Sequence, residues 1–236
     1  KNFNEYKKWY GINHKCKNLI QKSIYSITEF SRDKIKEYNI IACPGCYPTS
    51  IQIPLIPLLK NKLIKIKNII IDSKSGYSGA GKSINKKFKH KNLYNSITAY
   101  GVGNHRHTPE IDQELSFISN NKVNVRFTPH LIPMFRGILS TIYLETQNNI
   151  SAKKIYNFLK KYHKKNMFIK FKKFNSNLGT GDVMNTNNCQ ISVCKDGVKN
   201  RVIILSAIDN LIKGGSGQAI QNMNVAFNYK ESLGLR

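Results

Sequence analysis

The sequence predicts an α+β fold with a mixed, partly antiparallel sheet. Short apolar segments of strand length recur along the whole chain of 236 residues, and helical segments lie between them. Asp196-Gly197 stands between two of these apolar segments, which is a strong signal for a hairpin of antiparallel strands. Strands that are joined partly by a hairpin and partly by helices favour an α+β architecture over a purely parallel sheet.

Six segments have the length and the β-branched composition of strands. They are residues 39–43, 67–72, 122–128, 137–145, 189–194 and 201–208. The first of them, NIIAC, is apolar enough to be expected in the interior. Residues 73–83 are rich in glycine and serine and are expected to form a loop, and the polar residues 83–98 are expected to be irregular.

Helical patterns lie between these strands. The predicted helices fall within residues 1–38, 51–59, 104–115 and 151–162, and after the glycines at 214–217. In the first segment, three isoleucines between residues 20 and 27 recur at the spacing of one helix face. Thr108 is a predicted N-cap before a first-turn proline, Pro109, and Ser151 is the predicted cap of the fourth helix.

The charge balance is strongly basic, with 38 Lys and Arg residues against 13 Asp and Glu, a formal net charge of +25. Such a charge is typical of proteins that bind nucleic acids or anionic membranes. However, only six of the basic residues are arginines, and the scattered lysines accompany frequent Asn and Ile, which A/T-rich codons also produce. We therefore expect no specific nucleic-acid partner.

No apolar run reaches the ~18–20 residues that a membrane span needs, and no signal peptide is recognisable, so no membrane partner is expected. The five cysteines are an odd number in a chain without a signal peptide. This favours free thiols in a reducing compartment, and hence a cytoplasmic location.

Cys43-Pro44-Gly45-Cys46 forms a C-x-x-C motif with four interpretations. It could be a redox dithiol, half of a zinc site, a pair of inert buried cysteines, or a motif in which Cys46 alone is reactive. A zinc site needs a second close pair, and Cys189 and Cys194 have the wrong spacing for one. Cys46 stands just before a helix start, where the partial positive charge of the helix terminus is expected to lower its pKa and favour the nucleophilic thiolate.

Gly76–Ser83, GYSGAGKS, matches the P-loop pattern, which predicts a phosphate-binding NTPase. A P-loop must open directly into a helix, and the next segment, INKKFKHKNLYN, lacks helical periodicity, so a chance match is the alternative. A second candidate is His105-Arg106-His107-Thr108-Pro109-Glu110. Its imidazoles could serve thiol catalysis near neutral pH, or the segment could be a polar surface turn. His130 is interpreted as a loop histidine with satisfied hydrogen bonds.

Together these segments resemble the N-acetyl-gamma-glutamyl-phosphate reductases of arginine biosynthesis. The resemblance rests on five stretches in the order found in that family, over nearly the whole chain. They are ACPGCYPTS (42–50), IDSKSGYSGAGKS (71–83), HRHTPEIDQEL (105–115), FTPHLIPMFRGILSTIY (127–143) and DNLIKGGSGQAIQNMNVAFN (209–228). Five motifs in one order are more specific than either the C-x-x-C or the P-loop pattern alone.

The resemblance implies a substrate-and-dimerisation domain of the glyceraldehyde-3-phosphate/semialdehyde dehydrogenase-like type, attached to the remnant of a Rossmann-type domain. The expected division is 1–45 for the remnant of the dinucleotide-binding domain, 46–208 for the catalytic and dimerisation domain, and 209–236 for a C-terminal helix that returns to the first. No strand–GxGxxG–helix segment occurs in the chain. We therefore expect a C-terminal portion that binds NADPH poorly by itself.

The activity implied by the resemblance is the NADPH-dependent reduction of N-acetyl-L-glutamyl 5-phosphate to N-acetyl-L-glutamate 5-semialdehyde and phosphate, through a cysteine thioester. The implied partners are this small acyl phosphate, NADP(H) as cofactor, and further copies of the chain in a dimer or tetramer; no metal is implied. A P-loop NTPase and a basic nucleic-acid-binding module remain the alternatives.

By the same resemblance Cys46 is the catalytic thiol and His105 its acid/base, while His107, Glu110 and Arg136 contact the substrate. The cofactor-binding residues would be Ser75, Gly76, Ser78, Gly79, Ala80, Gly81 and Asn210. Two positions depart from the family pattern. Cys43 replaces an asparagine, and Lys82 replaces an arginine whose bidentate fork a lysine lacks.

Overall fold

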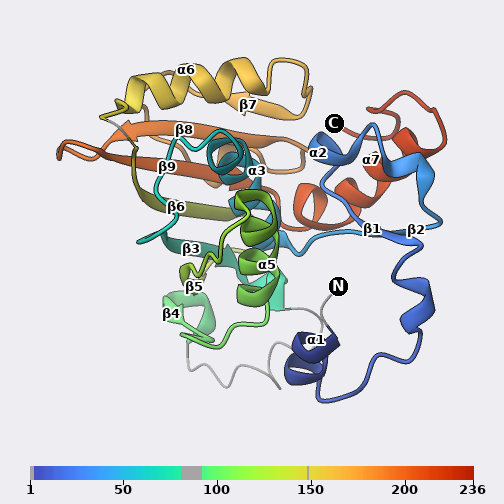
Figure 1. The fold of residues 1–236 in the computed structure, drawn as a ribbon. Coiled ribbons are helices and arrows are strands. Elements are labelled where there is room, and N and C mark those ends of the chain that lie inside the picture. Colours follow the sequence, from blue (N-terminus) through green and yellow to red (C-terminus); the bar gives the residue numbers. More distant parts are fainter. Residues whose placement is uncertain (1–2, 81–91, 148) are drawn as a thin grey trace.

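A seven-stranded mixed sheet forms the centre of the fold in the computed structural model, which describes residues 3–80, 92–147 and 149–236 (Figure 1). In spatial order the strands are β4 (Thr98–Ala99), β5 (Arg126–Ile132), β3 (Ile70–Gly76), β6 (Ile138–Glu145), β9 (Arg201–Ile208), β8 (Cys189–Lys195) and β7 (Ile169–Phe171). The pairs β3–β5 and β7–β8 are parallel and the other neighbours are antiparallel. The predicted α+β fold with a mixed sheet is therefore confirmed.

Helix α3 (Cys46–Lys60) is the central helix, and it packs against β6 and β9. Every residue from Tyr47 to Leu59 is buried, because the helix is apolar on nearly all sides. Helix α5 (Thr108–Ser119) lies beside α3 and buries Ile111 and Leu115. Helix α6 (Ala152–Tyr162) covers β8 and β9 with its apolar stripe and turns its lysines to solvent.

The sheet has one buried and one partly open face. Along β6 the side chains alternate, with Ile138, Ser140, Ile142 and Leu144 buried on the helix side. Tyr143, on the opposite face, is 38% exposed and pairs in register with Ile203 of β9. Part of this second face is covered by Leu178 and Val183, which pack against Leu139, Leu205 and Ala207. An apolar strip around Tyr143 stays uncovered in the described part of the chain.

The N-terminal segment and the C-terminal helix lie together at one side of the sheet (Figure 1). This group contains β1 (Ser23–Tyr25), α2 (Thr28–Ser31), β2 (Ile40–Ala42) and α7 (Gly217–Ala226), whereas α1 (Phe3–Tyr10) lies apart from α7. Strand β1 pairs in parallel with β2. The Asn222 side chain of α7 accepts hydrogen bonds from the hydroxyls of Ser26, at 2.8 Å, and Thr28, at 2.6 Å. These contacts fasten α7 to the first part of the chain.

Short helical turns complete the described chain. They are η1 (Lys17–Leu19), η2 (Ile35–Glu37), η3 (Tyr77–Ala80), η4 (Leu93–Asn95), η5 (Thr180–Asp182) and the π-helical η6 (Ile212–Ser216). None of the helices within the described residues has the length and apolar character that crossing a bilayer requires.

Several local predictions are wrong. Residues 1–38 are not one helical region, because Ser23–Tyr25 pairs with β2 as a strand. Strand β2 exists but is not buried, since Ile40 is 39% exposed and β1 is its one neighbour among the described strands. Strand β3 runs to Gly76, into the predicted loop, because β5 and β6 pair with it on both sides. Strand β7 was not predicted. Helix α3 begins at Cys46, five residues before the predicted start.

Candidate active site

Cys46 is the first residue of α3, and its sulfur lies at the end of the helix where backbone N–H groups are free. Gly45 precedes it as the N-cap in an extended conformation, with φ −65° and ψ 163°. The Cys46 side chain is half-buried, whereas Cys43 is exposed. The helix start that was predicted to activate Cys46 is therefore present, and it lies directly at the thiol.

The electrostatic effect on the thiol differs from the prediction. The pKa of Cys46 is raised to about 11, mainly by burial and to a smaller extent by the nearby Glu110 carboxylate. The backbone N–H groups of Tyr47 and Cys46 and the charge of Arg106 lower this pKa but do not outweigh the burial. The helix terminus therefore lowers the pKa of Cys46, as predicted, but by less than burial raises it. The thiol is protonated at neutral pH.

Both imidazoles of the H-R-H motif lie against the residues that flank Cys46. The His107 ring packs on Gly45 so closely that a Cβ at that position would lie 2.5 Å from Nε2. The His105 ring makes an edge contact with Tyr47 at a centroid distance of 5.6 Å. The sequence positions 46 and 105 are thus brought to one place, because α3 and α5 pack side by side.

Both histidines are neutral at pH 7. Burial is the main cause that lowers the pKa of His105 to about 4 and that of His107 to about 3, and the adjacent Arg106 charge contributes to both shifts. His105 Nδ1 accepts a hydrogen bond from the backbone N–H of His107 at 3.2 Å, so the single proton of its neutral ring is on Nε2. His107 Nδ1 is buried without a hydrogen-bond partner among the described residues.

Glu110, in the first turn of α5, connects this helix to the loop that precedes Cys46. Its Oε1 accepts the backbone N–H of Gly45 at 2.9 Å and lies 2.8 Å from the Tyr25 hydroxyl. Burial raises the pKa of Glu110, although these two hydrogen bonds act against the rise. The carboxylate therefore fixes the position of the residue before Cys46.

The predicted glycine and serine loop and Asn210 lie together, although they are far apart in sequence. Asn210 Nδ2 donates to Ser78 Oγ at 3.0 Å, and its Oδ1 accepts the N–H of Gly137 at 2.6 Å. Gly79 packs tightly here, because a Cβ would lie 2.9 Å from Ser75 Oγ and would force that hydroxyl to shift. Ser75 and Gly76 are the last two residues of β3 and both are buried, and η3, which ends at Ala80, follows directly.

The hydroxyl and amide groups at this edge are of the kind that form hydrogen bonds with the carboxamide of a nicotinamide ring. Residues 75–80 carry only small side chains and one tyrosine, and Gly79 lies close to the side chains of Ser75 and Asn210. A second glycine, Gly214, approaches Cys46 so closely that a Cβ would lie 2.7 Å from the Cys46 Cβ. Gly81 and Lys82 lie outside the described residues, as does part of the P-loop-like sequence.

Arg136 is engaged with a buried acid. Its Nη1 lies 3.4 Å from Oδ2 of Asp209, whose side chain is fully buried and also accepts the backbone N–H groups of Asn185 and Leu211. Asp209 thus holds the Arg136 guanidinium in place together with its backbone partners, and the substrate contact expected of Arg136 stays a prediction. Arg136 Nε is buried and has no hydrogen-bond partner among the described residues.

Sequence reasoning missed the tyrosines of the site. The Tyr100 hydroxyl donates to the Tyr47 hydroxyl at 3.0 Å, and both rings pack on His105. Tyr47 follows Cys46 directly, which was a usable signal, whereas Tyr25 and Tyr100 are placed by tertiary packing. The zinc interpretation of Cys43 and Cys46 finds no cluster of three suitable ligands in the described part of the chain.

The comparisons with known proteins agree on one family. The family model of the dimerisation domain of semialdehyde dehydrogenases matches residues 46–210. The probable N-acetyl-gamma-glutamyl-phosphate reductase, chloroplastic, of Arabidopsis thaliana is 46% identical over 100% of this chain and 59% of its own length. The N-acetyl-gamma-glutamyl-phosphate reductase of Clostridium botulinum (strain Alaska E43 / Type E3) is 47% identical over 99% of this chain and 68% of its own.

This chain therefore spans about three fifths of its plant relative and two thirds of its clostridial relative. Among solved structures, aspartate semialdehyde dehydrogenase II from Vibrio cholerae superposes with a TM-score of 0.68 at 18% identity. The superposition covers 88% of this chain and 69% of that one, and it shows that the two share a fold.

Proposed function

We propose, from the premise that this chain belongs to the family of N-acetyl-gamma-glutamyl-phosphate reductases, that it carries the acyl-transfer site of that activity. The reaction converts N-acetyl-L-glutamyl 5-phosphate reversibly to N-acetyl-L-glutamate 5-semialdehyde and phosphate. The observation that carries the proposal is the setting of Cys46. It begins a helix, and the residues on its two sides contact the two imidazoles of the H-R-H motif.

Cys46 is the proposed nucleophile. Its sulfur attacks the acyl carbon, the bond from that carbon to the phosphate oxygen breaks, and phosphate leaves with the electron pair and takes up the thiol proton. A thiol suits this reaction because it displaces phosphate readily and later leaves easily from the reduced product. Since burial holds the thiol pKa at about 11, the proton leaves the sulfur as the substrate reacts and not in the resting state.

His105 is the proposed acid/base of the reaction. Its neutral ring carries a proton on Nε2, which can donate a hydrogen bond to the acyl oxygen as negative charge develops there. The backbone N–H groups of Cys46 and Tyr47 at the helix terminus add to this stabilisation. Charge that develops in a buried site is stabilised more strongly by such fixed donors than by water.

His107, Glu110 and Arg136 are the proposed substrate residues. Glu110 supports the loop before Cys46, and His107 covers Gly45, so both determine the shape of the site next to the reacting carbon. Arg136 is held by the fully buried Asp209, and its positive charge is proposed to attract the anionic groups of the substrate.

When bound, a pyridine nucleotide supplies the hydride that reduces the acyl group, and we propose NADP(H) as its form. Of the chain's own residues, the serine and glycine segment at 75–80 and Asn210 would hold the nicotinamide end. Ser78 and Asn210 are joined by a hydrogen bond of 3.0 Å, which fixes the two side chains relative to each other. Gly81, outside the described residues, completes the proposed set.

The domain division at 1–45, 46–208 and 209–236 is also a proposal, supported by the contact of α7 with the N-terminal segment. We propose further that the open strip of the sheet around Tyr143 and Ile203 joins two copies of the chain. Both residues face the side that the helices leave uncovered, and the matching family model describes a dimerisation domain.

The other interpretations have less support. The relatives carry the name of the reductase, and none of the comparisons reported above points to an NTPase or a nucleic-acid-binding protein. A reducing, aqueous compartment such as the cytoplasm suits a site that needs a free thiol, and all five cysteines are free.

Acylation of the thiol tests the proposal. Purified chain is mixed with N-acetyl-L-glutamyl 5-phosphate, and the mass of each cysteine peptide is measured. We expect the acyl group on Cys46, its absence in Cys46→Ala, and no change in Cys43→Ala, which serves as the matched control within the same motif. Acylation that persists in Cys46→Ala, or that requires Cys43, would contradict the proposal.

A further inference from the structure

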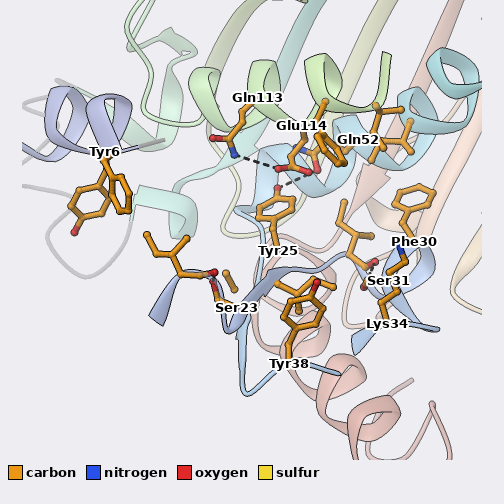
Figure 2. Close-up of a pocket in the computed structure, with 18 of the residues that line it drawn as sticks. Tyr6, Ser23, Tyr25, Phe30, Ser31, Lys34, Tyr38, Gln52, Gln113 and Glu114 are labelled. Carbon is orange, nitrogen blue, oxygen red and sulfur yellow. Dashed lines mark hydrogen bonds between the residues drawn. The ribbon is translucent and has the colours of Figure 1, made fainter. Parts of the chain in front are cut away.

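Tyr25, the last residue of β1, connects a surface groove with the active site. The groove has a volume of about 660 Å³ and is lined by the N-terminal segment, α3 and α5. Figure 2 shows the Tyr25 ring at this groove, with its hydroxyl directed toward Gln52 of α3. The side chain is half-buried, and its hydroxyl contacts the fully buried Gln52.

The Tyr25 hydroxyl lies 2.8 Å from Oε1 of Glu110 and 3.1 Å from Oε1 of Gln52. A phenol has one proton to donate, and the carboxylate is the closer and stronger acceptor. The same Glu110 oxygen accepts the N–H of Gly45 at 2.9 Å. A continuous path of two hydrogen bonds therefore leads from Tyr25 to the residue before Cys46.

We propose that Tyr25 is a positioning residue of the active site, whose phenol holds the Glu110 carboxylate on the N–H of Gly45 and thereby sets the position of the nucleophile loop. The proposal rests on the proposed function, because it assigns Tyr25 to the acylation of Cys46. Gly45 also connects to the helix, since its carbonyl accepts the N–H and the hydroxyl of Thr49. A displaced Gly45 would therefore move the first turn of α3.

The charge of Glu110 is sensitive to this phenol. The polar and charged groups around Glu110 come from β1, α3, the loop before α5 and α5 itself. They are Tyr25, Gln52, Cys46, Arg106 and Glu114. Burial raises the pKa of Glu110, Glu114 raises it further, and the Tyr25 and Gly45 hydrogen bonds and Arg106 lower it. Tyr25→Phe removes one of the groups that lower it, so the pKa of Glu110 rises.

The change therefore has a pH signature that a general loosening of the fold would lack. An ionised Glu110 accepts the Gly45 N–H more strongly than a protonated one. The acid limb of Cys46 acylation in Tyr25→Phe is expected to move to higher pH by roughly one unit, a tenfold loss of rate on that limb. At high pH, where Glu110 is ionised in both proteins, the loss becomes smaller.

A double-mutant cycle tests whether Tyr25 acts through Glu110. Acylation of Cys46 by N-acetyl-L-glutamyl 5-phosphate is measured against pH for the wild type, Tyr25→Phe, Glu110→Gln and the double variant. We expect Tyr25→Phe to have little further effect in the Glu110→Gln background, because the partner it orients is gone. Tyr38→Phe is the matched control, since Tyr38 lines the same groove and is not among the groups that shift the pKa of Glu110. Thermal unfolding verifies that each variant is folded.

A second readout needs no substrate. The reaction of Cys46 with 2,2′-dithiodipyridine is followed against pH by peptide mass spectrometry. Because the Glu110 charge raises the pKa of Cys46, ionisation of Glu110 produces an inflection in this profile. The inflection should move to higher pH in Tyr25→Phe, stay in place in Tyr38→Phe and vanish in Glu110→Gln.

These outcomes separate the two proposals. If the wild type is not acylated, the proposed function fails, and the thiol profile still decides whether Tyr25 sets the charge of Glu110. If Tyr25→Phe leaves both profiles where the wild type has them, or if its loss multiplies with that of Glu110→Gln, the positioning role of Tyr25 is refuted.

Discussion

Gly45 is the position where the smallest change should disturb the site most. In Gly45→Ala the new methyl group would lie 2.5 Å from Nε2, 2.8 Å from Cε1 and 3.0 Å from Cδ2 of His107. Ordinary contacts begin near 3.4 Å, so the ring must move by about 1 Å. The ring is confined by Tyr47 and His105, with centroid distances of 6.0 and 5.0 Å. Overpacking of this kind costs about 1–3 kcal/mol.

The effect on reactivity should exceed the effect on stability. A displacement of about 1 Å among reacting groups typically lowers a rate by ~100-fold, and we expect a loss of this order in Cys46 acylation. Gly179→Ala is the matched control, because nothing lies within 4 Å of its Cβ position and its φ is −131°. The acylation rate and the free energy of unfolding in urea are measured for both variants. If Gly45→Ala acylates as fast as Gly179→Ala, the described packing of His107 on Gly45 is refuted.

Three more predictions concern the Cys46 thiol, the buried ion pair of Lys213 and Glu29, and the open face of the sheet around Tyr143. At pH 7, alkylation of Cys46 should be about 100-fold slower than alkylation of a thiol with a pKa of 9.0. Its rate should rise tenfold per pH unit toward pH 11, and a midpoint of the rate–pH curve below pH 8 would count against the raised pKa. Lys213→Met leaves the buried Glu29, 2.6 Å from Lys213 Nζ, without its counter-ion and should cost about 3–5 kcal/mol in urea unfolding. Adding Glu29→Leu should recover most of that loss, and an undiminished loss would argue against the ion pair. Tyr143→Glu should convert an oligomer to monomers in analytical ultracentrifugation, and an unchanged mass would remove this face from the interface.

The ion pair also predicts how stability depends on pH. Burial alone would raise the pKa of Glu29, but the charge and hydrogen bond of Lys213 bring it below its ordinary value. The ionised pair therefore stabilises the fold above the unfolded-state pKa of about 4.3, and this contribution is lost as the pH falls through the lower folded-state pKa. Urea unfolding of the wild type and of Lys213→Met/Glu29→Leu between pH 3 and pH 7 would reveal the difference; parallel curves would contradict it.

Elements with strong local signals were predictable from the sequence. Ser151 caps α6, because its Oγ accepts the N–H of Lys154 at 3.2 Å. Gly197 turns the hairpin between β8 and β9 with a φ of 90°, a conformation that favours glycine. In both cases the deciding contact lies within a few residues, so the sequence pattern contains all the chemistry that the structure uses.

Elements that depend on distant partners were not predictable in this way. The isoleucines between residues 20 and 27 have helical spacing, yet β1 forms there because its backbone pairs with β2 at Ile40–Ala42. Strand β3 continues through Ser75 and Gly76 since two neighbours, β5 and β6, satisfy its hydrogen bonds. Tertiary pairing outweighed the local pattern in both segments.

In the candidate site, too, features with a local sequence signal were predictable and features that depend on tertiary packing were not. Cys46 and the H-R-H motif stand out in the sequence as thiol and imidazoles, and the structure brings their neighbours into contact. The sign of the thiol pKa shift was missed, because a helix terminus is visible in sequence and the burial that opposes it is not. The support from Tyr25 to Glu110 joins residues 85 positions apart, which a single sequence does not reveal.

Phosphate release from the acyl phosphate, measured in the first turnover without any nucleotide, tests the central claim most directly. One equivalent of phosphate per chain, released together with formation of a hydroxylamine-sensitive acyl group on the Cys46 peptide, is the predicted result. Phosphate release without a modified sulfur, or an acyl group on another residue, would mean that this thiol does not receive the substrate.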